Sequence, residues 1–117
     1  MSYTIQDAVA YVQEAIFKRI QTENQGEFTK EDFDDVFFSI LNDECDDFSV
    51  HLEEDSVQDL ILEYGLKKAI QLMIHNTDGR LEDAPDLETM VMFILQEKIY
   101  LCTNFASYTQ YCNENAQ

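Results

Sequence analysis

The side chains that most often carry out chemistry in proteins are scarce in this sequence. His51 and His75 are its only histidines, and each is flanked by ordinary helix or loop sequence. Together with Cys45 they could supply three zinc ligands, but a structural zinc site needs a fourth ligand and short paired spacings. The sequence also contains no GxSxG, P-loop, Rossmann glycine or HExxH motif. We therefore expect a protein that is not an enzyme and that binds neither a cofactor nor a metal.

Calcium is the other ligand to weigh, because carboxylates are abundant. Asp43, Asp47 and Glu54 occupy positions 1, 5 and 12 of a window that resembles an EF-hand loop. Position 3 is Cys45 rather than an oxygen ligand, and position 6, where the loop needs glycine for its turn, is Phe48. The window fails at its two most restrictive positions. The carboxylates are also too numerous for any two to stand out as a general acid and base.

Negative charge is the dominant feature of the composition. Asp and Glu together number 24, Lys and Arg number 7, and the formal net charge is −17. Residues 27–63 hold 14 of these acids and a single base, Lys30. Such a chain repels nucleic acid and anionic membranes, and it attracts a basic protein partner. The acids that we expect to contact this partner are Glu31, Asp34, Asp35, Asp43, Glu44, Asp46, Asp47, Glu53, Glu54 and Asp55.

This charge can resemble that of DNA only if it is concentrated on one face. A folded chain of 13.7 kDa exposes roughly 6,600 Å², so 17 net charges spread evenly leave about 390 Å² for each. Duplex DNA, taken as a cylinder of about 10 Å radius, carries one charge per about 110 Å². If the 13 net charges of residues 27–63 cover about a third of the surface, each has about 170 Å². Imitation of DNA therefore requires clustering.

Few turn residues interrupt the chain, which indicates helices joined by a few loops. With 117 residues, 3 Gly and 1 Pro, it has room for one domain, residues 1–117, and too few turn residues for a many-stranded β fold. Apolar residues recur at spacings of three and four, as in amphipathic helices. We predict an all-α, compact, acidic bundle of about five helices. The apolar stripes cover residues 5–20, 33–41, 57–74, 87–101 and 105–112.

Several helix boundaries can be predicted from capping residues. Four residues stand just before apolar stripes and can cap helix starts: Thr4, Thr29, Ser56 and Asp86. Residues 42–55 fit either a short helix or a partly irregular segment. The apolar face shifts across Gly65, which predicts a kink or two short helices there. We expect residues 76–86 to form a loop.

The segment from Leu87 to Leu101 is apolar on nearly every side of a helix. Such a helix must be buried on nearly every side. In a domain of this size, it is either the central helix or one shared with a second subunit. The composition of this segment leaves both alternatives open.

Three cysteines, Cys45, Cys102 and Cys112, form no CxxC pair, and an odd number suits a reducing compartment. The N-terminal residues have no basic region followed by a long apolar run, so they do not resemble a signal peptide. No stretch approaches 18 uninterrupted apolar residues, the length of a membrane span. We expect the protein in the cytoplasm.

The segment Pro85–Tyr100 reads PDLETMVMFILQEKIY. It resembles the corresponding stretch of the Ocr-like anti-restriction DNA-mimic proteins of short-tailed phages. The shared features are the opening Pro85-Asp86, the run Ile94-Leu95-Gln96, and Ile99-Tyr100 after a basic residue. Size, acidity and the order of helices agree as well. The tail differs, because residues 108–117 contain one acid, Glu114, where Ocr-like chains end in a strongly acidic run.

The resemblance implies a dimeric helical protein whose carboxylates imitate the phosphates of bent duplex DNA. Such a protein, phage-encoded and acting in the host cytoplasm, would occupy the DNA groove of a restriction-modification enzyme or another DNA-binding defence enzyme. Two alternatives stay open. One is an immunity-type or adaptor protein that binds a single basic partner through side-chain packing. The other is a small enzyme that uses an acidic pair.

Overall fold

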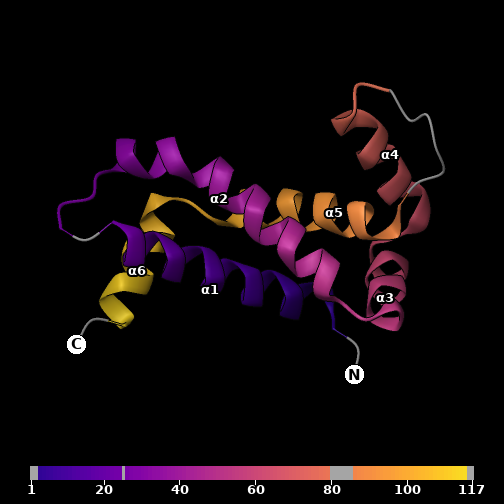
Figure 1. The fold of residues 1–117 in the computed structure, drawn as a ribbon, viewed down its shortest axis with the longest axis horizontal. Coiled ribbons are helices and arrows are strands. Elements are labelled where there is room, and N and C mark those ends of the chain that lie inside the picture. The colour runs from indigo at the N-terminus through magenta and orange to yellow at the C-terminus, as the bar shows by residue number, and fades with distance from the viewer. Residues whose placement is uncertain (1–2, 25, 80–85, 116–117) are drawn as a thin grey trace.

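A computed structural model describes residues 3–24, 26–79 and 86–115. All regular secondary structure in these ranges is helical, which confirms the predicted fold class (Figure 1). Six helices are present in these ranges, one more than the expected number of about five. They are α1 (Ile5–Glu23), α2 (Lys30–His51), α3 (Glu54–Tyr64), α4 (Leu66–Asn76), α5 (Leu87–Cys102) and α6 (Phe105–Glu114).

Helix α5 is the central helix of the bundle. It packs against α1, α2, α3 and α4, and its most extensive contact is with α2. Val91, Ile94, Leu95 and Ile99 of α5 are almost completely buried. Burial within one chain therefore accounts for this part of α5, whereas Leu87, Tyr100 and Leu101 of the same helix are exposed. The homodimer stays a prediction.

The starts of α1 and α2 are capped largely as the sequence predicts. Thr29 takes part in a complete capping box at the start of α2. The Thr4 hydroxyl accepts a hydrogen bond from the Asp7 N–H at 3.0 Å. Glu63 of α3 also contributes, because its carboxylate accepts from the Ile5 N–H at 2.8 Å. This bond ties the start of α1 to a helix that is distant in the sequence.

Helix α2 is longer than the sequence indicates. It continues without a break to His51, so the partly irregular alternative for residues 42–55 is wrong over most of that range. Tertiary packing explains the continuation. Cys45 and Ser49 face the core and are almost fully buried. The Phe48 ring packs on the Tyr11 ring of α1, with 5.3 Å between centroids. These contacts extend the buried side of α2 to its last turn.

Helix α3 begins earlier than predicted, and Gly65 separates it from α4. Ser56 is not the capping residue, because it is buried within the first turn of α3, and Glu53 occupies the N-cap position. Gly65 has a φ of +108°, a conformation that favours glycine. Of the two alternatives at this glycine, two short helices are therefore the one observed.

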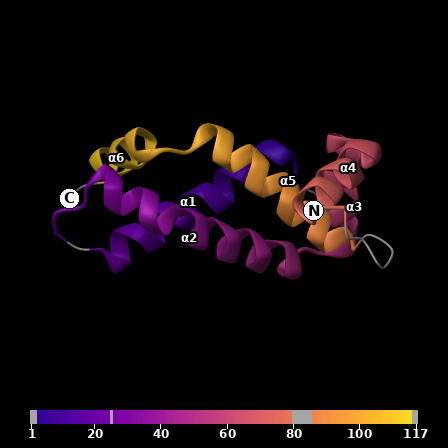
Figure 2. The same ribbon diagram turned by 90° about the horizontal axis from the view of Figure 1, so that it is seen from above.

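An aromatic cluster joins α6 to one end of the bundle. Tyr108 of α6 is buried, with its ring 5.8 Å from Phe33 of α2 and 5.7 Å from Phe17 of α1, measured between centroids. Burial raises the pKa of Tyr108 above its usual range. Figure 2 shows α6 (yellow) at the end of the molecule far from α3 and α4.

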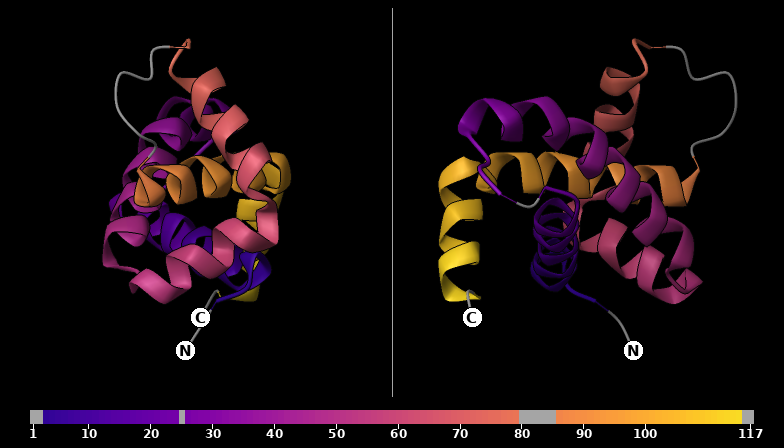
Figure 3. Two further views of the ribbon diagram at one scale, coloured as in Figure 1. Left: turned by 90° about the vertical axis from the view of Figure 1, so that its right-hand side faces the viewer. Right: turned by 60° about the vertical axis from the view of Figure 1, so that its left-hand side comes forward.

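The Cα atoms span 45 × 33 × 20 Å. Figure 3 shows α4 extending outward from the end where α3 and the start of α5 meet. Within the described ranges, none of the helices combines the length and apolar character that a membrane crossing requires. Residues 80–85, which include most of the expected loop and the first residue of the Pro85–Tyr100 segment, lie outside the described residues.

Candidate partner-binding face

The ten carboxylates predicted to contact a partner lie on two consecutive helices. Seven of them are on α2, and the remaining three are at the start of α3, where Glu53 is the N-cap and Glu54 and Asp55 form the first turn. Nine of the ten are exposed, and Glu44 is half-buried. A short connection joins the end of α2 to α3, so both sets belong to one stretch of the chain.

The carboxylates of α2 are closely spaced when projected onto the helix axis, in one group at each end of the helix. We define the acidic ridge as the eight acids of α2: Glu31, Asp32, Asp34, Asp35, Asp43, Glu44, Asp46 and Asp47. At 1.5 Å per residue, the first and the last are about 24 Å apart along the axis, which gives one carboxylate per about 3 Å. One strand of DNA carries a charge about every 3.4 Å. Before its cation partners are counted, the ridge therefore has about the linear charge density of one DNA strand.

Two cations already bind part of the ridge. Lys30 Nζ lies 2.7 Å from Asp34 Oδ2, one turn along the helix. Arg19 of α1 reaches across to α2, where its guanidinium lies 3.4 Å from Asp43 and 3.5 Å from Glu44. These contacts neutralise part of the local charge. They also orient the side of the ridge that faces α1.

The outer part of the ridge stays uncompensated. Among the described residues, Glu31, Asp35 and Asp46 form no ion pair, and all three are exposed. On an ideal helix they fall within about 60° of one another around the axis. Asp47 lies 3.3 Å from His51 Nε2, so this pair becomes an ion pair only when the histidine is protonated. Three aligned carboxylates are therefore available to a partner.

The ridge is interrupted at its middle by a stretch without acids. Residues 36–42 separate Asp35 from Asp43, a distance of about 12 Å along the axis. Phe38 lies in this gap and is 61% exposed. Its ring stacks on that of Tyr100 of α5, which is 55% exposed, with 5.6 Å between centroids. An exposed aromatic pair thus stands between two acidic groups.

Two acids that were not among the predicted contact residues extend the negative surface. Asp86 caps α5 and accepts a hydrogen bond from the Glu88 N–H at 2.9 Å. A hydrogen bond with the Asp86 side chain, the charge of Asp86, slight burial and the charge of Glu54 all raise the pKa of Glu88. Helices α3 and α5 pack against each other, and Glu54 of α3 is close enough to Glu88 of α5 for its charge to act there. No local pattern could reveal this, because Glu54 and Glu88 are far apart in the sequence.

Averaged over the whole molecule, the charge remains sparse. The accessible surface is 7649 Å². Divided among the 17 net charges, this surface leaves about 450 Å² for each, against about 110 Å² on duplex DNA. The surface is larger than the value expected from the mass, because the molecule is elongated. Any likeness to DNA therefore depends on the ridge and the adjoining start of α3.

Within the described part of the chain, no group of three or more His, Cys, Asp and Glu side chains is arranged to hold a metal ion. Burial, followed by the charge of Glu44, raises the pKa of the Cys45 thiol to about 12, so this thiol is protonated at neutral pH.

Comparison of the chain with protein-family models, with curated proteins and with solved structures finds no match. The function must therefore be inferred from the geometry and charge of this face.

Proposed function

We propose that the protein is a DNA mimic, which inhibits a restriction-modification enzyme or another DNA-binding defence enzyme by occupying its DNA-binding groove. The ten carboxylates of α2 and the start of α3 would stand in for phosphates. Such an inhibitor needs no turnover chemistry. It would act in the cytoplasm of the host cell, as a homodimer, and would compete with duplex DNA for the same basic residues.

The observation that carries this proposal is the spacing of charge along α2. Eight carboxylates over about 24 Å match the linear charge density of one DNA strand. A rigid helix holds them in two groups before binding, so a partner built to bind a phosphate backbone meets negative charge that is already fixed in place. Long-range attraction should make association fast and sensitive to salt.

One observation favours a second candidate. Phe38 and Tyr100 are exposed at the middle of the ridge, and Tyr11 is 59% exposed on α1. Aromatic side chains are the commonest anchors of protein interfaces. An immunity-type or adaptor protein, which binds one basic partner through side-chain packing, would also use such residues. Its binding should survive high salt and depend more on these aromatics than on the carboxylates.

Competition for DNA tests the proposal. A fluorescently labelled duplex is bound to a purified restriction-modification enzyme, and the acidic protein is titrated in at several NaCl concentrations. We expect it to displace the duplex, with a half-inhibitory concentration that rises steeply with salt. The ridge is then reversed in charge by four simultaneous substitutions to lysine, which should abolish displacement. These positions are Asp34, Asp35, Asp46 and Asp47.

A matched control carries the same change of net charge at exposed acids outside α2. Its four substitutions to lysine are at Asp7, Glu14, Asp59 and Glu114. This control should still displace DNA, although more weakly than the unaltered protein. Inhibition that persists in the ridge variant, while circular dichroism shows it to be folded, would exclude DNA mimicry by this face.

A further inference from the structure

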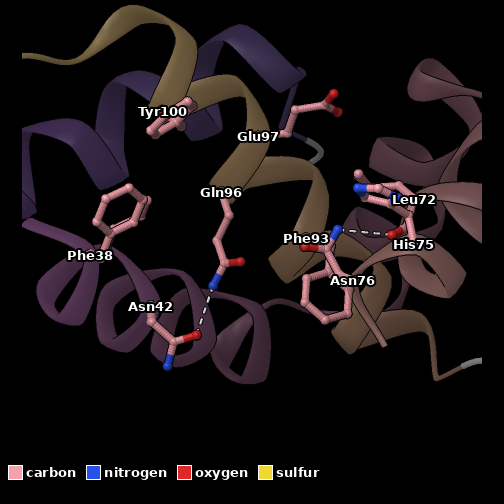
Figure 4. A pocket seen from close by; sticks show the side chains of 10 residues that line it. Phe38, Asn42, Leu72, His75, Asn76, Phe93, Gln96, Glu97 and Tyr100 are labelled. Carbon is pink, nitrogen blue, oxygen red and sulfur yellow. Dashed lines mark hydrogen bonds between the residues drawn. The ribbon is translucent and has the colours of Figure 1, made fainter. Parts of the chain in front are cut away.

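A groove between α2, α4 and α5 opens at the gap in the acidic ridge (Figure 4). Phe38 and Tyr100 stand at one end, and His75 and Asn76 of α4 lie at the other. Across the middle, the Gln96 Nε2 of α5 donates a hydrogen bond to Asn42 Oδ1 of α2 at 2.8 Å, which links two walls of the groove. The groove therefore combines exposed aromatic rings with amide groups.

The polar groups of this groove include several free hydrogen-bond acceptors. The Asn76 Nδ2 donates to the Leu72 carbonyl oxygen at 2.9 Å, which fixes the orientation of its amide and leaves the side-chain oxygen as an acceptor. Glu97 also lines the groove, and one of its carboxylate oxygens accepts from the Tyr64 hydroxyl at 2.7 Å. The other oxygen has no hydrogen-bond partner among the described residues. Amide oxygens and a carboxylate suit a ligand that only donates.

Charge further restricts the kind of ligand. The α2 wall of the groove is formed by Phe38, Leu41 and Asn42, which lie along the helix between the acids of residues 31–35 and those of residues 43–47. None of the described residues that line it is lysine or arginine. An anionic ligand such as a nucleotide would meet repulsion from both sides. A cationic side chain would be attracted.

Arginine fits these features better than lysine. Its guanidinium is planar, stacks on aromatic faces, is only weakly hydrated and carries five N–H donors with no acceptor. The rings of Phe38 and Tyr100 offer it an exposed aromatic surface. Lysine carries a compact and strongly hydrated charge, which gains less from a flat ring.

We propose that this groove binds an arginine side chain of the basic partner, with the guanidinium on the Phe38–Tyr100 pair and its N–H groups toward the side-chain oxygen of Gln96. This inference rests on the proposed function, since it assumes a partner with a basic surface. It adds a defined contact for one side chain of the partner, which surface charge alone would not provide. The ridge would attract the partner, and the groove would fix its register.

Two peptides of equal charge test the groove. Hexa-arginine and hexa-lysine are titrated separately into the protein by calorimetry in 150 mM NaCl. We expect hexa-arginine to bind about two- to fivefold more tightly, the range expected for a cation on an exposed aromatic ring. Amide chemical shifts should change at Phe38, Gln96 and Tyr100 with hexa-arginine and less with hexa-lysine.

Aromatic substitutions separate the groove from the rest of the face. Phe38→Ala and Tyr100→Ala should each reduce the ratio of the two affinities toward one. Tyr11→Ala is the matched control, because Tyr11 is about as exposed but does not line this groove, and it should leave the ratio unchanged. Thermal melts establish that each variant is folded.

The two proposals can fail independently. Neutralising ridge acids should weaken the binding of both peptides by the same factor. A change shared by the two affinities therefore reports on the ridge, and a change in the ratio of the two affinities reports on the groove. Equal affinities for the two peptides, or a ratio that survives both aromatic substitutions together, would overturn the arginine proposal while leaving DNA competition intact. A third peptide carries one leucine in the middle of its six lysines. If this peptide bound as tightly as hexa-arginine, an apolar side chain would occupy the groove, and that result would also overturn the arginine proposal.

Discussion

Two triple variants with the same net charge provide the sharpest test of the ridge. Both remove three negative charges from α2 and take the net charge from −17 to −14. They differ only in whether the substituted carboxylates already have a cation partner. The free-acid variant is Glu31→Gln, Asp35→Asn and Asp46→Asn. The paired-acid variant is Asp34→Asn, Asp43→Asn and Glu44→Gln.

The expected difference follows from the ion pairs of the structure. An exposed ion pair with a partner contributes typically 0.2–1 kcal/mol, so three free carboxylates at about 0.5 kcal/mol each contribute about 1.5 kcal/mol. Their loss should weaken binding about tenfold. A paired carboxylate must give up Lys30 or Arg19 before it can bind a partner cation, so its net contribution is near zero. The paired-acid variant should therefore lose about twofold at most.

The assay is displacement of labelled duplex DNA from a restriction-modification enzyme in 150 mM NaCl. At this salt the Debye length is about 8 Å, which screens most of the long-range effect that both variants share. Melting curves control for folding. The free-acid variant should be at least as stable as the unaltered chain because self-repulsion falls, whereas the paired-acid variant also loses three ion pairs. Equal loss of binding in the two variants would refute the reasoning, because contact with the free carboxylates would then not matter.

Two further predictions concern stability. Ile99→Ala removes a fully buried side chain from α5 and should cost about 2–5 kcal/mol, which a melting curve would register as a fall of about 8–20 °C. Glu88 should make stability depend on pH, because its pKa is raised by Asp86, and the folded chain binds this proton more tightly than the unfolded one. Just above the ordinary pKa of glutamate, stability should fall as pH rises. Acidification toward that range should raise the melting temperature, and Glu88→Gln should reduce the rise; an unchanged pH profile would contradict the assignment.

The helical fold follows from periodicity, and helix ends follow where capping is local. Thr4, Thr29 and Asp86 cap helices as their sequence context predicts. Ser56 fails as a cap because packing of α3 buries it, and burial overrides the local preference. Similarly, residues 42–51 read as ambiguous because polar and acidic residues dominate them. They stay helical because Cys45, among others, is held in the core.

The charge of the candidate site is visible in the sequence, but its arrangement is not. The doublets of acids predict an exposed face on α2, and nine of the ten chosen residues are indeed exposed. Which of them are free depends on Arg19, which lies on α1 and reaches Asp43 on α2. Similarly, the pairing of Phe38 with Tyr100 joins α2 to α5. Such contacts arise from helix packing, which leaves no local signal.

The single residue between α3 and α4 has a consequence for the groove. Because Gly65 alone makes the connection, the direction of α4 is determined by the torsion angles of one position. Leu72, His75 and Asn76 form one wall of the groove, so its width follows from the same angles. A side chain at position 65 would disfavour the positive φ and shift the backbone toward other angles. A glycine that does not itself line the groove thus influences how wide a guest α2, α4 and α5 can admit together.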